Sequence, residues 1–121
     1  MKKCIMIVDD FSSIRSMITI ILKGAGYETV EAKDGRDALS KLESTLVHMV
    51  ITDLSMPNLD GMGLVKGIRS NPAYAAIPII MLTTEARDSK RQEGKSAGVT
   101  SWLVKPFKPE QLLEAVKKAL G

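Results

Sequence analysis

The sequence predicts a doubly wound α/β domain, in which helices cover both faces of a five-stranded parallel sheet. Short, uninterrupted apolar runs rich in β-branched residues recur along the chain, as in strands that are buried on both faces. Helical patterns alternate with these runs five times, which indicates parallel strands joined by right-handed crossovers. At 121 residues the chain can build one hydrophobic core, so we expect a single domain over residues 1–121.

Four of the expected strands are defined by apolar runs and by the polar residues that end them, whereas residues 28–32 alternate like a short strand. Asp9 and Asp10 end the first run, and Asp53 ends the third. Thr83 follows the fourth run and Lys105 follows the fifth. The five strands are expected over residues 4–8, 28–32, 47–52, 79–82 and 102–104.

The first, second and last helices have recognisable ends. Ser12 or Ser13 offers an N-cap for the first helix, and Asp34 offers one for the second. Glycine tolerates the left-handed exit from a helix, and the pair that closes the first helix is Gly24 and Gly26. Pro109 suits the first turn of the last helix. The third helix is marked by an apolar stripe at Leu64, Val65 and Ile68.

The fourth helix, expected over residues 85–97, differs from the others. It is nearly all polar, and it contains Gly94. Helices without an apolar stripe are poorly anchored to the rest of a domain. We therefore expect this helix to be the one most easily displaced.

Composition argues against several classes of function. The net charge of +3 is modest and its carriers are dispersed, so we expect no nucleic-acid partner. Cys4 is the only cysteine, which excludes an internal disulfide and a cysteine-based zinc site. No apolar run approaches the ~20 residues of a membrane helix, and the N-terminal run is too short for a signal peptide. We expect a monomeric cytoplasmic protein with no membrane partner.

The polar residues at the strand ends form a candidate site. In a parallel sheet the carboxyl ends of the strands share one edge, and ligands bind outside that edge. This places Asp9, Asp10, Asp53, Thr83 and Lys105 together. Two carboxylates about 4 Å apart repel by about 4 kcal/mol at an effective dielectric of about 20. A divalent cation removes the conflict, and an all-oxygen ligand set favours Mg²⁺, with Ca²⁺ or Mn²⁺ able to substitute.

This set of groups is equipped for phosphoryl transfer. A carboxylate can attack phosphorus, while a metal ion and a lysine neutralise the phosphoryl oxygens and a hydroxyl donates a further hydrogen bond. The pattern resembles the response-regulator receiver family, whose members have a flavodoxin-like fold. The resemblance covers the whole chain and rests on the residues named above, on MPNLDG shortly after Asp53, and on Lys105-Pro106-Phe107. DDFSSIR, with no output domain in sight, is most similar to stand-alone chemotaxis regulators of the CheY type.

The resemblance implies a role for each site residue. Asp53 would accept a phosphoryl group from a histidine kinase, and Thr83 and Lys105 would bind its oxygens. Lys105-Pro106 would be a cis peptide, which an X-Pro bond permits. Mg²⁺ would be held by Asp9 through water, by Asp10 and Asp53, and by the backbone carbonyl of Ser55.

The resemblance also implies a switch. Thr83 would move inward on phosphorylation and allow the aromatic residue of the fifth strand, here Trp102, to rotate. The surface of the fourth helix, fifth strand and fifth helix would then change its affinity for partners. Those partners would be a chemotaxis-type histidine kinase and either a flagellar motor switch protein or a phosphatase. The protein would catalyse only its own phosphorylation and autodephosphorylation.

Three other functions are consistent with parts of the pattern. A phosphorelay intermediate, a phosphate sink or a receiver fragment of a larger regulator would use the same site. A Mg²⁺-dependent aspartyl-phosphate hydrolase of the haloacid-dehalogenase type would place a second aspartate two residues after its nucleophile. Phe11 stands two residues after Asp9, and Ser55 two after Asp53, which disfavours that enzyme. A flavin or nucleotide site would need a glycine-rich phosphate loop, which this chain lacks.

Overall fold

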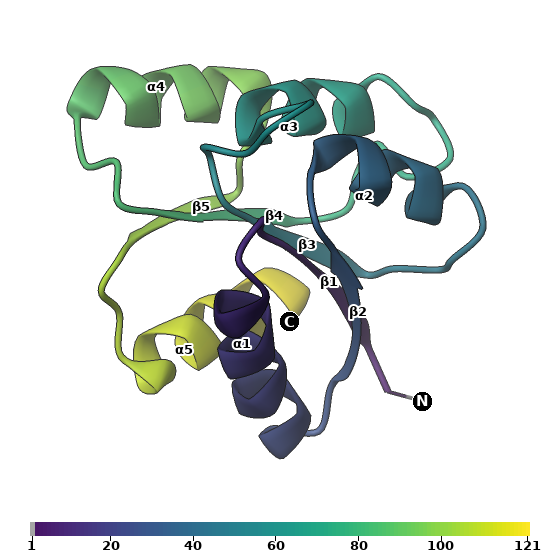
Figure 1. Cartoon of the computed structure of the whole chain (residues 1–121), viewed down its shortest axis with the longest axis vertical. Helices are drawn as coiled ribbons and strands as arrows, with labels where there is room; N and C mark the ends of the chain where they lie inside the picture. Colours follow the sequence, from purple (N-terminus) through teal and green to yellow (C-terminus); the bar gives the residue numbers. More distant parts are fainter. Residues whose placement is uncertain (1) are drawn as a thin grey trace.

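A computed structural model describes residues 2–121 and contains one parallel sheet (Figure 1). Its strands are β1 (Cys4–Val8), β2 (Glu28–Ala32), β3 (Met49–Thr52), β4 (Ile79–Thr83) and β5 (Ser101–Val104). They lie in the order β2-β1-β3-β4-β5, and every neighbouring pair is parallel. After β1 the chain adds β2 on one side of it. The chain then returns to add β3, β4 and β5 on the other side. The carboxyl ends of β1 and β3 therefore flank the point where the winding reverses, where such sheets bind ligands.

The helices form a layer on each face of the sheet. They are α1 (Ser12–Gly24), α2 (Gly35–Leu42), α3 (Gly61–Arg69), α4 (Asp88–Ala97) and α5 (Pro109–Leu120). Helices α2, α3 and α4 cover one face, and α1 and α5 cover the other (Figure 1). The predicted doubly wound, flavodoxin-like single-domain fold is confirmed. Among the described residues, no helix is both long enough and apolar enough to cross a bilayer.

Two hydrophobic clusters, one on each face, explain the uninterrupted apolar strands. Along β1, Met6 belongs to the cluster beneath α2 and α3, whereas Ile5 and Ile7 belong to the cluster beneath α1 and α5. All three side chains are fully buried. Each such burial stabilises the fold by about 1.5–3 kcal/mol, which favours apolar residues throughout β1 until the strand ends at Val8.

Five predicted element boundaries were wrong. The fourth strand ends at Thr83 rather than at residue 82, and the fifth begins at Ser101 rather than at residue 102. The third strand begins at Met49 rather than at residue 47, because Val47 is buried in the core without joining the sheet. The N-cap of α1 is Phe11 rather than Ser12 or Ser13, and it makes no side-chain capping bond. The Asp9 carboxylate accepts the backbone N–H of Phe11 at 2.9 Å, which turns the chain one residue earlier than expected.

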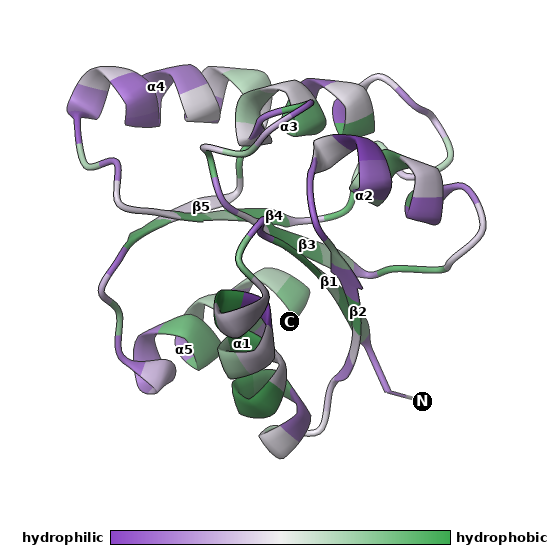
Figure 2. Cartoon of the chain, viewed as in Figure 1, coloured by the Kyte–Doolittle hydropathy of each residue, from purple (hydrophilic) through white to green (hydrophobic). Residues whose placement is uncertain are grey.

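Helix α4 begins at Asp88, three residues later than predicted. The carboxylate of Glu85 accepts the backbone N–H of Arg87 at 3.1 Å, so a local turn takes the place of the first helical turn. Figure 2 shows that α4 is mostly hydrophilic. Gly94 is its one buried residue, as the polar sequence led us to expect of a weakly anchored helix.

Candidate functional site

The register of the sheet brings two of the predicted site residues together. Val8 pairs with Thr52, so the residues that follow them, Asp9 and Asp53, emerge side by side at the carboxyl ends of β1 and β3. The backbone N–H of Asp53 donates to the carbonyl of Val8 at 3.0 Å, which continues the ladder past the last strand residue. Rigid strands thus fix the positions of both carboxylates.

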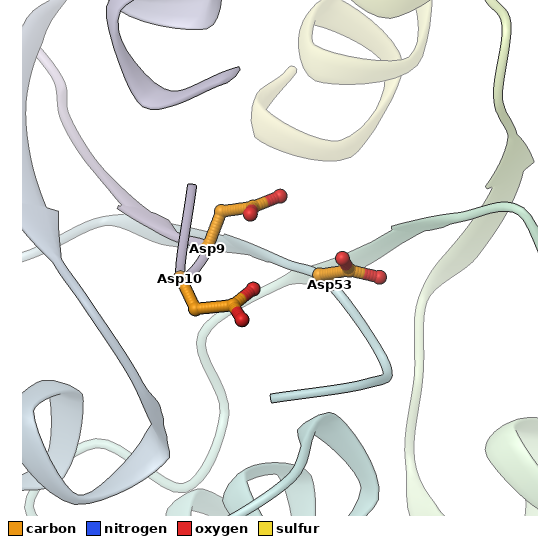
Figure 3. A group of neighbouring side chains, drawn as sticks. All are labelled: Asp9, Asp10 and Asp53. Carbon is orange, nitrogen blue, oxygen red and sulfur yellow. The ribbon is translucent and has the colours of Figure 1, made fainter. Parts of the chain in front are cut away.

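Three carboxylates gather at this edge. Oxygen atoms of Asp9, Asp10 and Asp53 all lie within 4.8 Å of one another. Figure 3 shows the three side chains as neighbours just beyond the ends of β1 and β3. Asp9 is buried, Asp53 is half-buried and Asp10 is exposed, so the group is open to solvent on the Asp10 side.

Lys105 provides the positive charge at the centre of the group. Its Nζ lies 3.2 Å from Oδ2 of Asp9 and 3.3 Å from Oδ2 of Asp53. The backbone N–H of Lys105 donates to the carbonyl of Thr83 at 2.8 Å, so the β4–β5 ladder carries the lysine to the same edge. The predicted cis peptide between Lys105 and Pro106 is present.

The three carboxylates and one lysine of the group leave negative charge that is not compensated. Burial raises the pKa of the Asp9 carboxyl above its ordinary value of 3.8, and the neighbouring Asp53 raises it further. The Phe11 N–H and Lys105 act in the opposite direction. One lysine faces three carboxylates without a histidine or cysteine donor in the group. This donor set fits a hard divalent cation such as Mg²⁺.

Thr83 and Trp102, the two predicted switch residues, are joined through the backbone of Glu85. The hydroxyl of Thr83, a residue only 3 % exposed, accepts the N–H of Glu85 at 3.3 Å. Nε1 of Trp102 donates to the carbonyl of Glu85 at 2.8 Å. The sequence could not reveal this link, because it uses backbone atoms that every residue type possesses.

Ser55 lies in the loop after β3, where it is exposed. This position follows the strand that carries Asp53, so its carbonyl remains a predicted metal ligand. Asp60, at the end of the same loop, serves the helix instead of the carboxylate group, whereas Gly61, the first residue of α3, packs so closely on the backbone of Asp53 that a Cβ would clash there. The Asp60 carboxylate caps α3 by accepting the N–H of Gly63 at 2.8 Å.

Arg15 is a supporting residue that sequence reasoning missed. Its guanidinium donates to the backbone carbonyl of Asp9 at 2.6 Å and pairs with Glu31 at 3.0 Å. Arg15 therefore fixes the backbone that presents the buried carboxylate. Its place in the first turn of α1, directly after the two aspartates, is the only sequence signal that could have suggested this role.

Comparisons with known proteins agree with the geometry. The response regulator receiver domain family matches residues 5–117. Chemotaxis protein CheY1 of Helicobacter pylori is 40% identical over 119 residues, which are 97% of this chain and 96% of that protein. The structure of chemotaxis protein CheY4 of Vibrio cholerae has a TM-score of 0.95 and 44% identity, and covers 99% of this chain and 100% of its own.

A third relative carries a metal ion. The receiver domain of a sensor histidine kinase from Pseudomonas aeruginosa, 28% identical, has a TM-score of 0.91 over 100% of this chain and 99% of its own. That structure has a magnesium ion coordinated in its active-site cleft. The present chain belongs to the response regulator receiver domain family and is CheY-like over nearly its whole length.

Proposed function

We propose that this protein is a signalling switch, activated when a histidine kinase transfers a phosphoryl group to Asp53. The observation that carries the proposal is the position of the Lys105 ammonium group, which contacts both the half-buried carboxylate of Asp53 and the buried carboxylate of Asp9. A cation in that position can compensate the charge of a phosphoryl group on Asp53.

The chemical step is a displacement at phosphorus. A carboxylate oxygen of Asp53 forms the new O–P bond while the P–N bond to the donor histidine breaks, and the electron pair of that bond returns to the imidazole nitrogen. Lys105 then holds phosphoryl oxygens, with Thr83 supplying a hydroxyl. Asp9, Asp10, Asp53 and the carbonyl of Ser55 would hold Mg²⁺, which supplies neutralising charge for the phosphoryl oxygens when bound.

Exposed apolar residues near the site support docking of a kinase domain there. Phe11, which directly follows Asp10, is 62 % exposed, and Ile20 on α1 is 73 % exposed. Phe107 and Pro109 line a groove with residues of α1. Apolar surface beside the acceptor carboxylate is suited to a partner that must bring its phosphohistidine within bonding distance of Asp53.

The similarity to chemotaxis proteins over nearly the whole chain supports a role in chemotaxis. We propose a chemotaxis-type kinase as the donor, and a flagellar motor switch protein or a phosphatase as the partner of the α4, β5 and α5 surface, all in the cytoplasm. The protein would act only on its own phosphoryl group. A phosphate sink or a phosphorelay intermediate would differ in the partner alone.

The proposal is tested with acetyl phosphate or beryllofluoride, with and without Mg²⁺, while the emission of Trp102 is followed. We expect a Mg²⁺-dependent change that Asp53→Asn abolishes. Asp60→Asn is the matched control, because asparagine also caps a helix and residue 60 lies outside the carboxylate group. No response in the wild type would contradict the switch, and turnover of many phosphoester equivalents would indicate a hydrolase.

A second experiment identifies the output partner. The beryllofluoride-treated protein is used to capture either a flagellar motor switch peptide or fragments of a chemotaxis kinase. Preferential retention of the switch peptide by the activated form supports the motor as the target. Equal retention by both forms contradicts an output that depends on phosphorylation.

A further inference from the structure

Gly94 lies in the interior of α4, where glycine lowers the stability of a helix. It lies within Asp88–Ala97, and no left-handed backbone angle requires it. Glycine is the weakest helix former after proline, so its place in a helix interior calls for a packing reason. Gly94 is also the one fully buried residue of α4, and the half-buried Ala97, three residues later, packs against the core cluster.

The packing reason is the indole of Trp102. A Cβ atom added at Gly94 would lie 2.7 Å from Cζ3 and 3.0 Å from Cε3 of Trp102. Real Cβ atoms do not approach other atoms as closely as 2.7 Å, so even alanine would displace the ring or the helix. The absence of a side chain at Gly94 therefore leaves a space that the six-membered ring of the indole occupies. We call this space the seat of Trp102.

The opposite edge of the same indole is fixed by its hydrogen bond to the carbonyl of Glu85. The N–H of that residue donates to the hydroxyl of Thr83. The seat at Gly94 and the hydrogen bond at Glu85 together hold one orientation of Trp102, and they connect it to the threonine at the phosphoryl site.

We propose that Gly94 is the positioning residue for the switch tryptophan, and that the seated indole is the element that ties α4 to the sheet. This inference rests on the proposed function, because it assigns a mechanism to the same switch. When Trp102 leaves its seat, the one fully buried residue of α4 loses its contact with the indole, and the helix is held less firmly.

The seat is tested by thermal unfolding of Gly94→Ala in two backgrounds. An alanine replacing glycine in a helix normally raises the melting temperature. We expect it to lower the melting temperature when Trp102 is present and to raise it in the Trp102→Leu background, which has no ring atoms at the seat. Gly24→Ala in α1 is the matched control, since a Cβ there meets nothing within 4 Å. The same sign in both backgrounds would overturn the proposal.

Aggregation of the single variant would not end the test. If Gly94→Ala fails to fold, recovery of folding in the Gly94→Ala, Trp102→Leu double variant supports the seat. Failure of the double variant as well would overturn it, because α4 would then reject the alanine for a reason unrelated to the indole.

The switching role needs a readout that packing alone would not change. In Gly94→Ala we expect red-shifted Trp102 emission without any phosphoryl donor, and loss of at least half of the emission change that Mg²⁺ and beryllofluoride produce in the wild type. The phosphorylated fraction after acetyl phosphate treatment should be unchanged. An unaltered emission response would overturn this inference alone, whereas absent phosphorylation of the wild type would overturn the proposed function.

Discussion

Helices α3 and α4 lie side by side on the same face of the sheet, yet they are attached to it in opposite ways. Helix α3 presents an apolar stripe to the core, and its buried residues are Gly61, Met62, Leu64, Val65 and Ile68. Helix α4 has one buried residue, Gly94, and otherwise displays charged and polar side chains. The difference is visible in Figure 2 as a change of colour between adjacent helices.

The unequal attachment suits the two helices to different roles. Helix α3 begins just after the loop that carries Asp53 and Ser55, so its firm attachment helps to keep the proposed acceptor site rigid. Helix α4 begins just after Thr83 and Glu85, and a weakly attached element there can respond to changes at the site. Elements that move in signalling are drawn from the least stable parts of a fold.

The largest test of the comparison is truncation of a buried α3 side chain. Ile68 is fully buried, so Ile68→Ala should cost about 2–5 kcal/mol of unfolding free energy. Gln92→Ala on the exposed side of α4 should change it by no more than about 0.5 kcal/mol. Urea unfolding measures both, and equal losses would contradict the unequal attachment of the two helices.

Hydrogen exchange tests the comparison without a mutation. We expect amides of α4 to exchange through local opening at least about tenfold faster than amides of α3, which open only with the core. Mg²⁺ with beryllofluoride should accelerate exchange in α4 and leave α3 unchanged. If residues 85–97 exchange as slowly as the other helices and do not respond, the proposed mobility of α4 is wrong.

A smaller effect is expected from Asp9, the buried carboxylate at the end of β1. Folding favours the protonated form of Asp9, because burial raises its pKa above 3.8. The stability contributed by this group is therefore present at low pH and is lost as the pH rises through the raised folded pKa. Without divalent cations, Asp9→Asn should raise the melting temperature by a few degrees at pH 7 and have little effect at pH 3.

Magnesium provides the control for that measurement. A cation that binds the folded state stabilises it, and the full set of carboxylates should bind it more tightly than the Asp9→Asn variant does. Added Mg²⁺ should therefore raise the melting temperature of the wild type more than that of the variant. An equal rise in both proteins would place the ion away from Asp9.

The smallest effect concerns the turn that precedes α4. Hydrogen bonds from Arg87 lower the pKa of the Glu85 carboxyl from 4.5 to about 2. Arg87→Gln should raise that pKa toward 4.5, as an NMR titration of the carboxyl carbon would measure. The native interaction is present above pH 4.5 and lost as the pH falls toward 2, so stability at pH 7 should barely change. A large loss of stability would show that this exposed pair anchors α4.

Most of the fold could be predicted because each strand and helix has a strong local signal. The apolar runs must be buried on both faces, and only a parallel sheet between helical layers provides this. The convergence of Asp9, Asp53 and Lys105 followed from the sheet itself, since parallel strands end at one edge. Val47 misled the prediction of the third strand because burial and sheet pairing give the same apolar pattern.

Other features depend on contacts that no local pattern encodes. The start of α4 is set by the carboxylate of Glu85 folding onto Arg87, and the start of α1 by Asp9 bonding to Phe11. Gly94 was recognised as a weak point in a helix, but its role as a seat requires the position of Trp102. The proposed metal-binding role of Ser55 concerns a backbone atom, so it came from family resemblance alone.

The position of Lys105 in the chain has a consequence for biosynthesis. Its ammonium group bridges back to Asp9, 96 residues earlier, and reaches Asp53 from the last strand of the sheet. During translation both aspartates emerge long before their cation does. A nascent or truncated chain that stops before β5 therefore carries Asp9 and the proposed acceptor, Asp53, without the lysine. Competence to receive a signal would then coincide with completion of the domain.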